Sequence, residues 1–235
     1  MPDNAAPLIL LTRPIAQAER FADLCRDAFA EKAEILIAPM QEIVLRDLPP
    51  VPPNAALIFT SENGVRAYQA AGGQAGLTAY CVGDRTARVA AEAGLQALSA
   101  GGAAGDLVEL IRRDTPDGPL IHLHGTHVRG EIAEQLGAAG FNVAGHVAYD
   151  QRSLSLTEEA RGALTGPRRV IVPLFSPRSA ALFAAELPDG ATAEPICISV
   201  ATKAALPLAL QSGAGVANAP TGAAMLKALA RQLSP

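Results

Sequence analysis

The chain has 235 residues, of which 49% are hydrophobic and 18% are charged, and its formal net charge is −4. This length suits one large or two small domains, and the composition is that of a well-cored protein rather than a disordered chain. The acidic balance and the absence of any Lys/Arg-rich run argue against a general nucleic-acid-binding protein.

Short apolar runs alternate with Ala-rich helical stretches along the whole chain. In chain order, the expected strands cover residues 8–12, 34–38, 56–60, 79–82, 95–98, 119–124, 141–150, 169–175, 195–199 and 215–218. The expected helices cover residues 16–30, 63–72, 85–93, 105–113, 129–139, 157–164, 178–186, 201–211 and 222–233. This alternation predicts an α/β protein with parallel sheets of the Rossmann or flavodoxin type. Pro207 falls inside one expected helix, which we therefore expect to be kinked or broken.

The chain repeats itself once. "LIFTSENGVRAY" (57–68) matches "PLFSPRSAALF" (173–183), and "YCVGDRTARVAAEAG" (80–94) matches "ICISVATKAALPLALQSG" (196–213). Two further segments keep the same order, at an offset of about 115 residues. The repeat predicts two α/β units related by internal duplication, each with helix N-termini capped by Ser or Thr.

Both units place small polar residues where a strand ends and a helix begins. Ligands of open α/β sheets bind at this edge, and a helix N-terminus there contributes up to about 1–2 kcal/mol to binding of an anion. Capping alone explains each residue equally well, but both units carry the same set. We therefore expect two such edges, facing each other across a hinge, to bind a ligand with several carboxylates or phosphates. A Walker A sequence is absent, so a nucleotide is not specifically indicated.

The chain resembles the uroporphyrinogen-III synthase family nearly from end to end. The matching pieces, in order, are "LLTRP" (10–14), "PMQEI" (39–43), "FTSENGV" (59–65), "VGDRTA" (82–87), "GTHVRGEIAEQLGAAGFNVAGHVAYDQR" (125–152), "LFSPRSA" (174–180), "ISVATKAAL" (198–206) and "APTGAAMLKAL" (219–229). The resemblance implies that residues 1–37 and 153–235 form one discontinuous α/β domain and that residues 42–148 form the other. It also implies that residues 38–41 and 149–152 are two antiparallel connecting strands, which form the hinge.

The resemblance implies a cofactor-free hydro-lyase. Its substrate would be hydroxymethylbilane, a linear tetrapyrrole with an acetate and a propionate on every ring. Loss of water and inversion of the last ring would give uroporphyrinogen III. It further implies a monomer, with transient contact with the preceding enzyme of the pathway as a possible partnership. The alternative is a two-lobed binding module for a small polyanion without catalysis, which explains the repeat and the hinge but not the family match.

The resemblance implies that Tyr149 assists departure of the substrate's hydroxyl, whereas packing of the connecting strand is the alternative role. The candidate substrate contacts are Arg13, Ser61, Asn63, Gly64, Gly83, Thr86, His124, Arg129, Ser176, Ser179, Ser199, Thr202 and Thr221. Arginines would pair with carboxylates, hydroxyls would donate to them, and glycines would let the backbone approach the ligand. Solvated arginines and ordinary helix caps are equally good explanations of single members.

The histidines of "HLHGTH" (122–127) resemble a metal-ligand cluster, because alternate residues of a strand share one face. Neither a carboxylate nor a cysteine stands near them in a ligand pattern, so we expect no metal and instead assign His124 to hydrogen bonding with the ligand.

The three cysteines, Cys25, Cys81 and Cys197, lie far apart among apolar neighbours. They are typical of buried thiols in a reducing compartment. The apolar run near the N-terminus is short and lacks a positive flank, and no segment approaches the length of a membrane span. We therefore expect a cytoplasmic protein without membrane contact.

Overall fold

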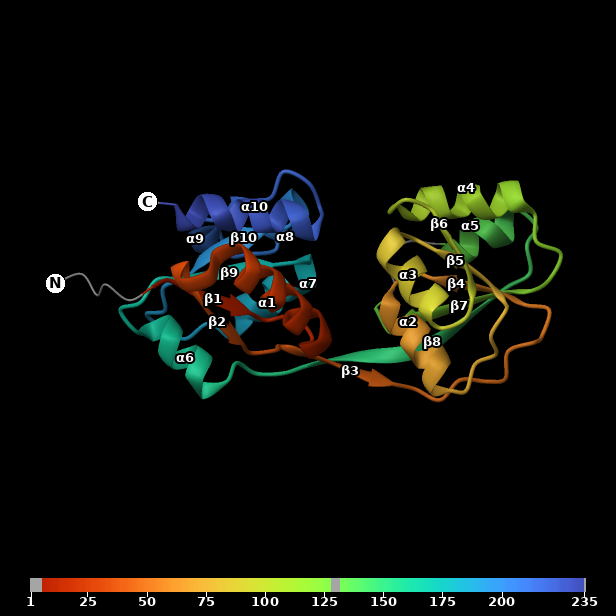
Figure 1. The fold of residues 1–235 in the computed structure, drawn as a ribbon, viewed down its shortest axis with the longest axis horizontal. Helices are drawn as coiled ribbons and strands as arrows, with labels where there is room; N and C mark the ends of the chain where they lie inside the picture. Colours follow the sequence, from red (N-terminus) through yellow and green to blue (C-terminus); the bar gives the residue numbers. More distant parts are fainter. Residues whose placement is uncertain (1–5, 128–131, 235) are drawn as a thin grey trace. The chain divides into compact units, whose positions relative to one another are not determined.

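The computed structural model describes residues 6–127 and 132–234, and the chain divides into two compact units. Unit 1 combines Met1–Glu42 with Ser153–Pro235, and unit 2 is Ile43–Arg152. Each unit has a sheet with helices on both of its faces (Figure 1). The chain passes from one unit to the other within two strands, β3 (Gln41–Leu45) and β8 (Val143–Ser153), which are neighbours in one sheet.

Unit 1 contains a five-stranded parallel sheet in the order β11-β10-β9-β1-β2. Its strands are β1 (Leu8–Leu11), β2 (Glu34–Ile37), β9 (Val170–Leu174), β10 (Glu194–Cys197) and β11 (Gly215–Val216). Its helices are α1 (Ile15–Phe29), the 3₁₀ turn η1 (Ala30–Lys32), α6 (Glu158–Thr165), α7 (Pro177–Ala185), α8 (Val200–Ala204), α9 (Leu208–Gln211) and α10 (Gly222–Leu233). Strands β1 and β9 are buried throughout, because α1 and α10 cover one face and α6 and α7 cover the other.

Unit 2 contains a six-stranded sheet in the order β3-β8-β7-β4-β5-β6. Its remaining strands are β4 (Ala56–Phe59), β5 (Thr78–Cys81), β6 (Gln96–Ser99) and β7 (Leu120–Gly125), and β4 to β8 pair in parallel. Its helices are α2 (Glu62–Ala70), α3 (Asp84–Glu92), α4 (Ala104–Asp114) and α5 (Ile132–Ala138). Helices α2 and α3 cover one face, and α4 and α5 cover the other (Figure 1).

The two sheets share one strand order. When β4, β5 and β6 are matched with β9, β10 and β11, strands β7 and β8 take the places of β1 and β2. In each sheet the order reverses at one pair of neighbours, β4 and β7 in unit 2 and β9 and β1 in unit 1. The carboxyl ends of strands at such a switch point are where open α/β sheets hold ligands.

The sequence correctly predicted an α/β protein with parallel sheets, and Pro207 divides the helix expected at 201–211 into α8 and α9. The connecting strand expected at 38–41 instead lies at β3, because Ala38 and Met40 are buried in unit 1, where their N–H groups donate to the carbonyls of β1 and of the residue after it. The strand expected at 141–150 and the connecting segment expected at 149–152 form one continuous strand, β8. Among the described helices, none is long and apolar enough to cross a membrane.

Helix α2 packs very closely on β7 at Gly64, the third residue of the helix. A Cβ atom at this position would lie 2.6 Å from the carbonyl oxygen of Leu123 and 3.2 Å from the ring of Phe59. The close backbone approach predicted for Gly64 is therefore made to a strand of its own unit.

His122 belongs to the core of unit 2. It lies within β7, its side chain is 2% exposed, and its buried Nε2 has no hydrogen-bond partner among the described residues. Burial, and to a smaller extent the nearby His124, lower the pKa of His122 to about 4. The imidazole is therefore neutral at pH 7.

We expect Gly64→Ala to lower the free energy of unfolding by about 1–3 kcal/mol, the usual range for overpacking, because α2 must move away from β7. The matched control is Gly105→Ala in α4, where an added Cβ meets nothing within 4 Å. This control should be neutral or more stable by up to about 1 kcal/mol, since alanine is the better helix former. Urea unfolding followed by circular dichroism measures both, and equal stabilities would contradict the close packing.

Protonation of the buried His122 should weaken the fold in acid. The folded state lowers the pKa of His122 from 6.5 to about 4, so the unfolded chain binds the proton more tightly, and stability is lost as pH falls through this window. Between pH 7 and pH 4 the wild-type protein should lose about 3 kcal/mol more than His122→Leu, which cannot be protonated. Urea unfolding of both proteins across this range measures the difference, and parallel pH profiles would refute the assignment.

Candidate functional site

The N-terminus of α2 lies at the carboxyl end of β4, at the switch point of unit 2. Ser61 is the N-cap, and its Oγ accepts a hydrogen bond from the backbone N–H of Asn63 at 3.2 Å. The side chain of Asn63 is buried, whereas Ser61 is half-buried. This edge therefore places a capping hydroxyl and a buried amide side by side.

Tyr149 of β8 reaches these two residues. Its side chain is 6% exposed, and its hydroxyl hydrogen-bonds with the side chains of Ser61 and Asn63. Burial raises the pKa of Tyr149 above its ordinary value of 10, and this effect outweighs the two hydrogen bonds, which lower it. Tyr149 is therefore a protonated phenol at neutral pH, able to donate a proton or a hydrogen bond.

A bulge in β8 determines the direction of Tyr149. His124 pairs with Val147 and Gly125 pairs with Tyr149, so Ala148 is an extra residue in the ladder. Alternation along a regular strand would send neighbouring residues to opposite faces, yet Ala148 and Tyr149 both pack in the cluster under α2 and α3. The bulge thus turns the tyrosine toward the N-terminus of α2, and nothing in the sequence pattern indicated it.

The neighbouring edge of unit 2 is formed by α3. Gly83 is the N-cap of α3 and provides no side-chain cap, while Thr86, one turn into the helix, is buried. The expectation that a Ser or Thr side chain caps this helix is wrong, because the N-cap position is occupied by glycine. Arg85 donates to the carboxylate of Glu62 at 3.2 Å, which links α3 to the first turn of α2.

In unit 1 the predicted hydroxyl residues form two pairs. Ser176 caps α7 in a capping box with Ser179, in which each backbone N–H donates to the other side chain at 3.0 Å. Ser199 caps α8 by accepting from the N–H of Thr202 at 3.2 Å, and their hydroxyls lie 3.1 Å apart. Ser179 and Thr202 are buried, so their side chains hold the helix starts in place.

The remaining candidate at a helix start is Thr221, an exposed N-cap that accepts from the N–H of Ala224 at 3.2 Å. Arg13 follows β1 at the switch point of unit 1, and its guanidinium lies 3.9 Å from the centre of the Phe175 ring. This cation–π contact orients the arginine at the edge where β1 and β9 end.

The last two predicted contacts are His124 and Arg129. Nδ1 of His124 lies 2.9 Å from the carbonyl oxygen of Gly125, so one ring nitrogen interacts with its own strand. Arg129 lies outside the described residues.

The two remaining candidate chemistries, metal binding and thiol reactivity, depend on the arrangement of His, Cys, Asp and Glu side chains among the described residues. Within residues 6–127 and 132–234, no group of three His, Cys, Asp or Glu side chains is arranged to hold a metal ion. The three cysteines are free and buried. Burial raises the pKa of Cys25 and Cys81 to about 12 and that of Cys197 to about 11, so all three are unreactive thiols at neutral pH.

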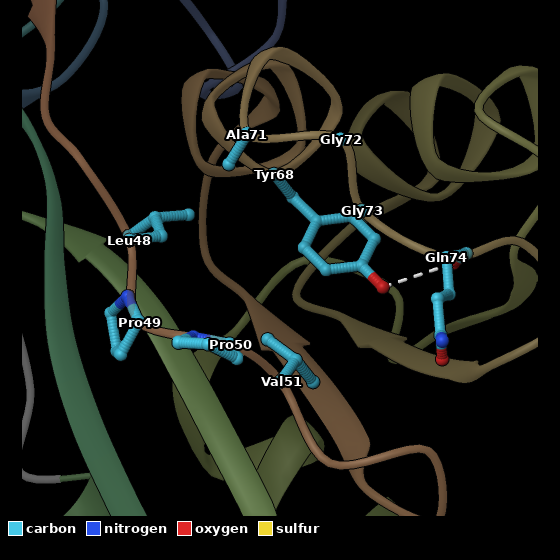
Figure 2. A pocket seen from close by; sticks show the side chains of 9 residues that line it. All are labelled: Leu48, Pro49, Pro50, Val51, Tyr68, Ala71, Gly72, Gly73 and Gln74. Carbon is cyan, nitrogen blue, oxygen red and sulfur yellow. Dashed lines mark hydrogen bonds between the residues drawn. The ribbon is translucent and has the colours of Figure 1, made fainter.

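Unit 2 also has a hollow of about 300 Å³ at the other end of α2. Figure 2 shows it between Leu48–Val51 and the turn that follows α2, where the hydroxyl of Tyr68 donates to the carbonyl of Gln74 at 2.9 Å. A nine-residue helix is about 13 Å long, so this hollow is well separated from Ser61 and Asn63. It contains none of the predicted site residues.

Comparison with known proteins gives a consistent result. The family model for uroporphyrinogen-III synthase HemD matches residues 20–227, while a search of curated proteins finds no match. The crystal structure of uroporphyrinogen-III synthetase from Helicobacter pylori 26695 has a TM-score of 0.67 and 19% identity, covering 97% of this chain and 100% of the other. A mutant uroporphyrinogen III synthase from the extremely thermophilic bacterium Thermus thermophilus has a TM-score of 0.54 and 18% identity, covering 97% and 99%.

At these identities the two structures show a shared fold, and they share it over almost their whole length. The family model adds a match in sequence over most of the chain. The chain therefore belongs to the uroporphyrinogen-III synthase family.

Proposed function

We propose that the protein is a uroporphyrinogen-III synthase, which cyclises hydroxymethylbilane to uroporphyrinogen III with loss of water. The observation that carries this proposal is the family match over residues 20–227. The substrate has an acetate and a propionate on every ring, so the protein must bind a polyanion. The reaction is a cyclisation with inversion of the last ring, and it needs control of conformation more than it needs a strong acid or base.

The sheet edges are the proposed binding surfaces for the carboxylates. Along the carboxyl edge of each sheet, helices begin with their backbone N–H groups at the ends of strands, and each such N-terminus attracts an anion by about 0.3–1 kcal/mol. The proposed contacts are the first turns of α2, α3, α7, α8 and α10, with the capping residues Ser61, Gly83, Ser176, Ser199 and Thr221. Arg13 would add a charged partner in unit 1, and Thr86, Ser179 and Thr202 would hold the helix starts rigid.

The chemistry begins with loss of the substrate's terminal hydroxyl. The pyrrole nitrogen pushes electrons toward the carbon–oxygen bond, and the phenol of Tyr149 would donate the proton with which the hydroxyl leaves as water. Departure of water leaves an azafulvene, which the substituted α-carbon of the last ring attacks to give a spiro intermediate. The bond from this carbon to its original methylene bridge then breaks, and that methylene forms a new bond to the free α-carbon, which inverts the ring. A proton lost when the last pyrrole recovers its aromaticity restores the phenol, so the reaction consumes no net acid.

We also propose that the two units arose by internal duplication and that β3 and β8 serve as a hinge. The shared strand order and the repeated segments support the duplication, because matched strands carry matched sequences. The monomeric state and a transient contact with the preceding enzyme of the pathway stay predictions of the family resemblance.

Product analysis tests the proposed function. Purified protein is mixed with freshly prepared hydroxymethylbilane, and the oxidised products are separated into isomers I and III. We expect isomer III in large excess, whereas heat-denatured protein should give isomer I, the product of spontaneous closure. Formation of isomer I alone, at the spontaneous rate, would overturn the proposed synthase activity and favour a polyanion-binding module without catalysis.

Removing the hydroxyl of Tyr149 tests its role in the reaction. We expect Tyr149→Phe to lower kcat by up to about 100-fold, at or below the low end of effects for a lost proton donor, because departure of the hydroxyl is intrinsically easy. The product should stay isomer III, since binding rather than the phenol imposes ring inversion. Tyr68→Phe, which removes a hydroxyl at the far end of α2, is the matched control and should keep the wild-type kcat. Wild-type turnover by Tyr149→Phe would reduce Tyr149 to a packing residue.

A further inference from the structure

The surroundings of Tyr149 contain a residue that neither the repeat nor the family resemblance singled out. Gly125 is the last residue of β7 and lies opposite Tyr149 in the parallel ladder. A Cβ atom at position 125 would lie 2.6 Å from Cε2, 2.7 Å from Cζ and 3.0 Å from the hydroxyl oxygen of Tyr149. The tyrosine ring therefore occupies the space that any other side chain at this position would need.

The backbone next to this contact is also held in place. The N–H of Thr126 donates to the carbonyl of Tyr149 at 3.1 Å, and the N–H of Arg46 in the segment after β3 donates to the carbonyl of the bulge residue Ala148 at 2.9 Å. The bulge is thus bonded on both sides, and Tyr149 cannot move away from Gly125 without breaking these bonds. An added methyl group would therefore have to displace the ring.

The hydroxyl of Tyr149 is held from the opposite direction by α2. The Oγ of Ser61 accepts the N–H of Asn63 with one lone pair, which fixes the capping hydroxyl, and its O–H can donate to the phenolic oxygen of Tyr149. The hydrogen bond between Asn63 and Tyr149 lowers the pKa of the phenol, so the buried amide donates to the phenolic oxygen through one of its N–H groups. The phenol's own proton is then left for another acceptor. A hydrogen bond received by the phenolic oxygen also makes its O–H a better proton donor.

We propose that Gly125 and Asn63 are positioning residues, which together hold the Tyr149 hydroxyl where it can donate a proton to the departing hydroxyl of the substrate. Gly125 leaves the space for the ring, and Asn63 anchors the phenolic oxygen. The proposal rests on the proposed role of Tyr149 in catalysis. It gives Asn63 a role that acts through the tyrosine, in place of the direct substrate contact expected from the sequence.

The two roles of Asn63 make different kinetic predictions. If Asn63 acts through Tyr149, Asn63→Ala should lower kcat about as much as Tyr149→Phe, with KM changed less than about twofold, and should have little further effect in the Tyr149→Phe background. If Asn63 binds a substrate carboxylate directly, KM should rise, and the effects of the two substitutions should multiply. Asn63→Asp, which has the same shape but only accepts hydrogen bonds, should behave as Asn63→Ala does.

Gly125→Ala tests the space under the ring. We expect its kcat to fall about as far as that of Tyr149→Phe, while Gly137→Ala in α5, where an added Cβ meets nothing within 4 Å, should keep the wild-type kcat. Gly125→Ala could also fail to fold, in which case the Asn63 variants alone decide the proposal. Wild-type kcat in a folded Gly125→Ala, or a raised KM with unchanged kcat in Asn63→Ala, would overturn it.

A measurement without substrate separates this proposal from the proposed function. The chain has three tyrosines, so ¹³Cζ-tyrosine NMR assigned with Tyr→Phe variants can follow Tyr149 through a pH titration. Loss of the Asn63 donor should raise the pKa of Tyr149 further, whereas Gly125→Ala, by pushing the ring toward solvent, should bring it back toward 10. These shifts in a protein that forms no isomer III would refute the proposed function alone, and a titration unchanged in both variants would refute the positioning role.

Discussion

Two positions without side chains, Gly64 and Gly125, determine how the polar groups of unit 2 come together. At the first, α2 rests directly on the backbone of β7, and at the second, the ring of Tyr149 lies directly over the same strand. The bulge at Ala148 then turns the tyrosine to the face that α2 covers. Because α2 and the ring of Tyr149 both pack directly on β7, a small displacement of either would separate the phenol from Ser61 and Asn63.

The hydroxyl residues at the sheet edges illustrate how folding and binding use the same groups. In unit 1, Ser176 with Ser179 and Ser199 with Thr202 satisfy each other and the first N–H groups of their helices. A side chain that caps a helix also keeps the neighbouring backbone N–H groups in a fixed direction. Preorganised backbone donors of this kind bind carboxylates without the entropy cost of ordering long charged side chains. This fits a site for a polyanion in a chain that has no Lys/Arg-rich run.

Periodicity and capping signals were sufficient to predict the α/β class, the parallel sheets, the break at Pro207 and the full length of α10, since these depend on local patterns of apolar residues, proline and glycine. They were not sufficient for β3, a short strand whose residues alternate only weakly, or for the bulge, which exists only in the pairing of β7 with β8. The same limit applies to the site. Ser61 and Asn63 were predicted as residues at a strand end, but their contact with Tyr149 joins positions more than 80 residues apart in sequence. The role of Gly125 depends on the ring that lies over it, which only the folded structure shows.

The central claim is that Tyr149 is a buried, protonated phenol that gives its proton to the departing hydroxyl. Replacing Tyr149 by ring-fluorinated tyrosines lowers the pKa of the phenol in steps while leaving its shape nearly unchanged. Measured at a pH where every analogue stays protonated, kcat should rise steadily as the pKa of the phenol falls, because a stronger acid transfers its proton more readily in the transition state. A kcat that stays constant across the series, with isomer III still formed, would contradict the claim and leave the tyrosine with a role in packing alone.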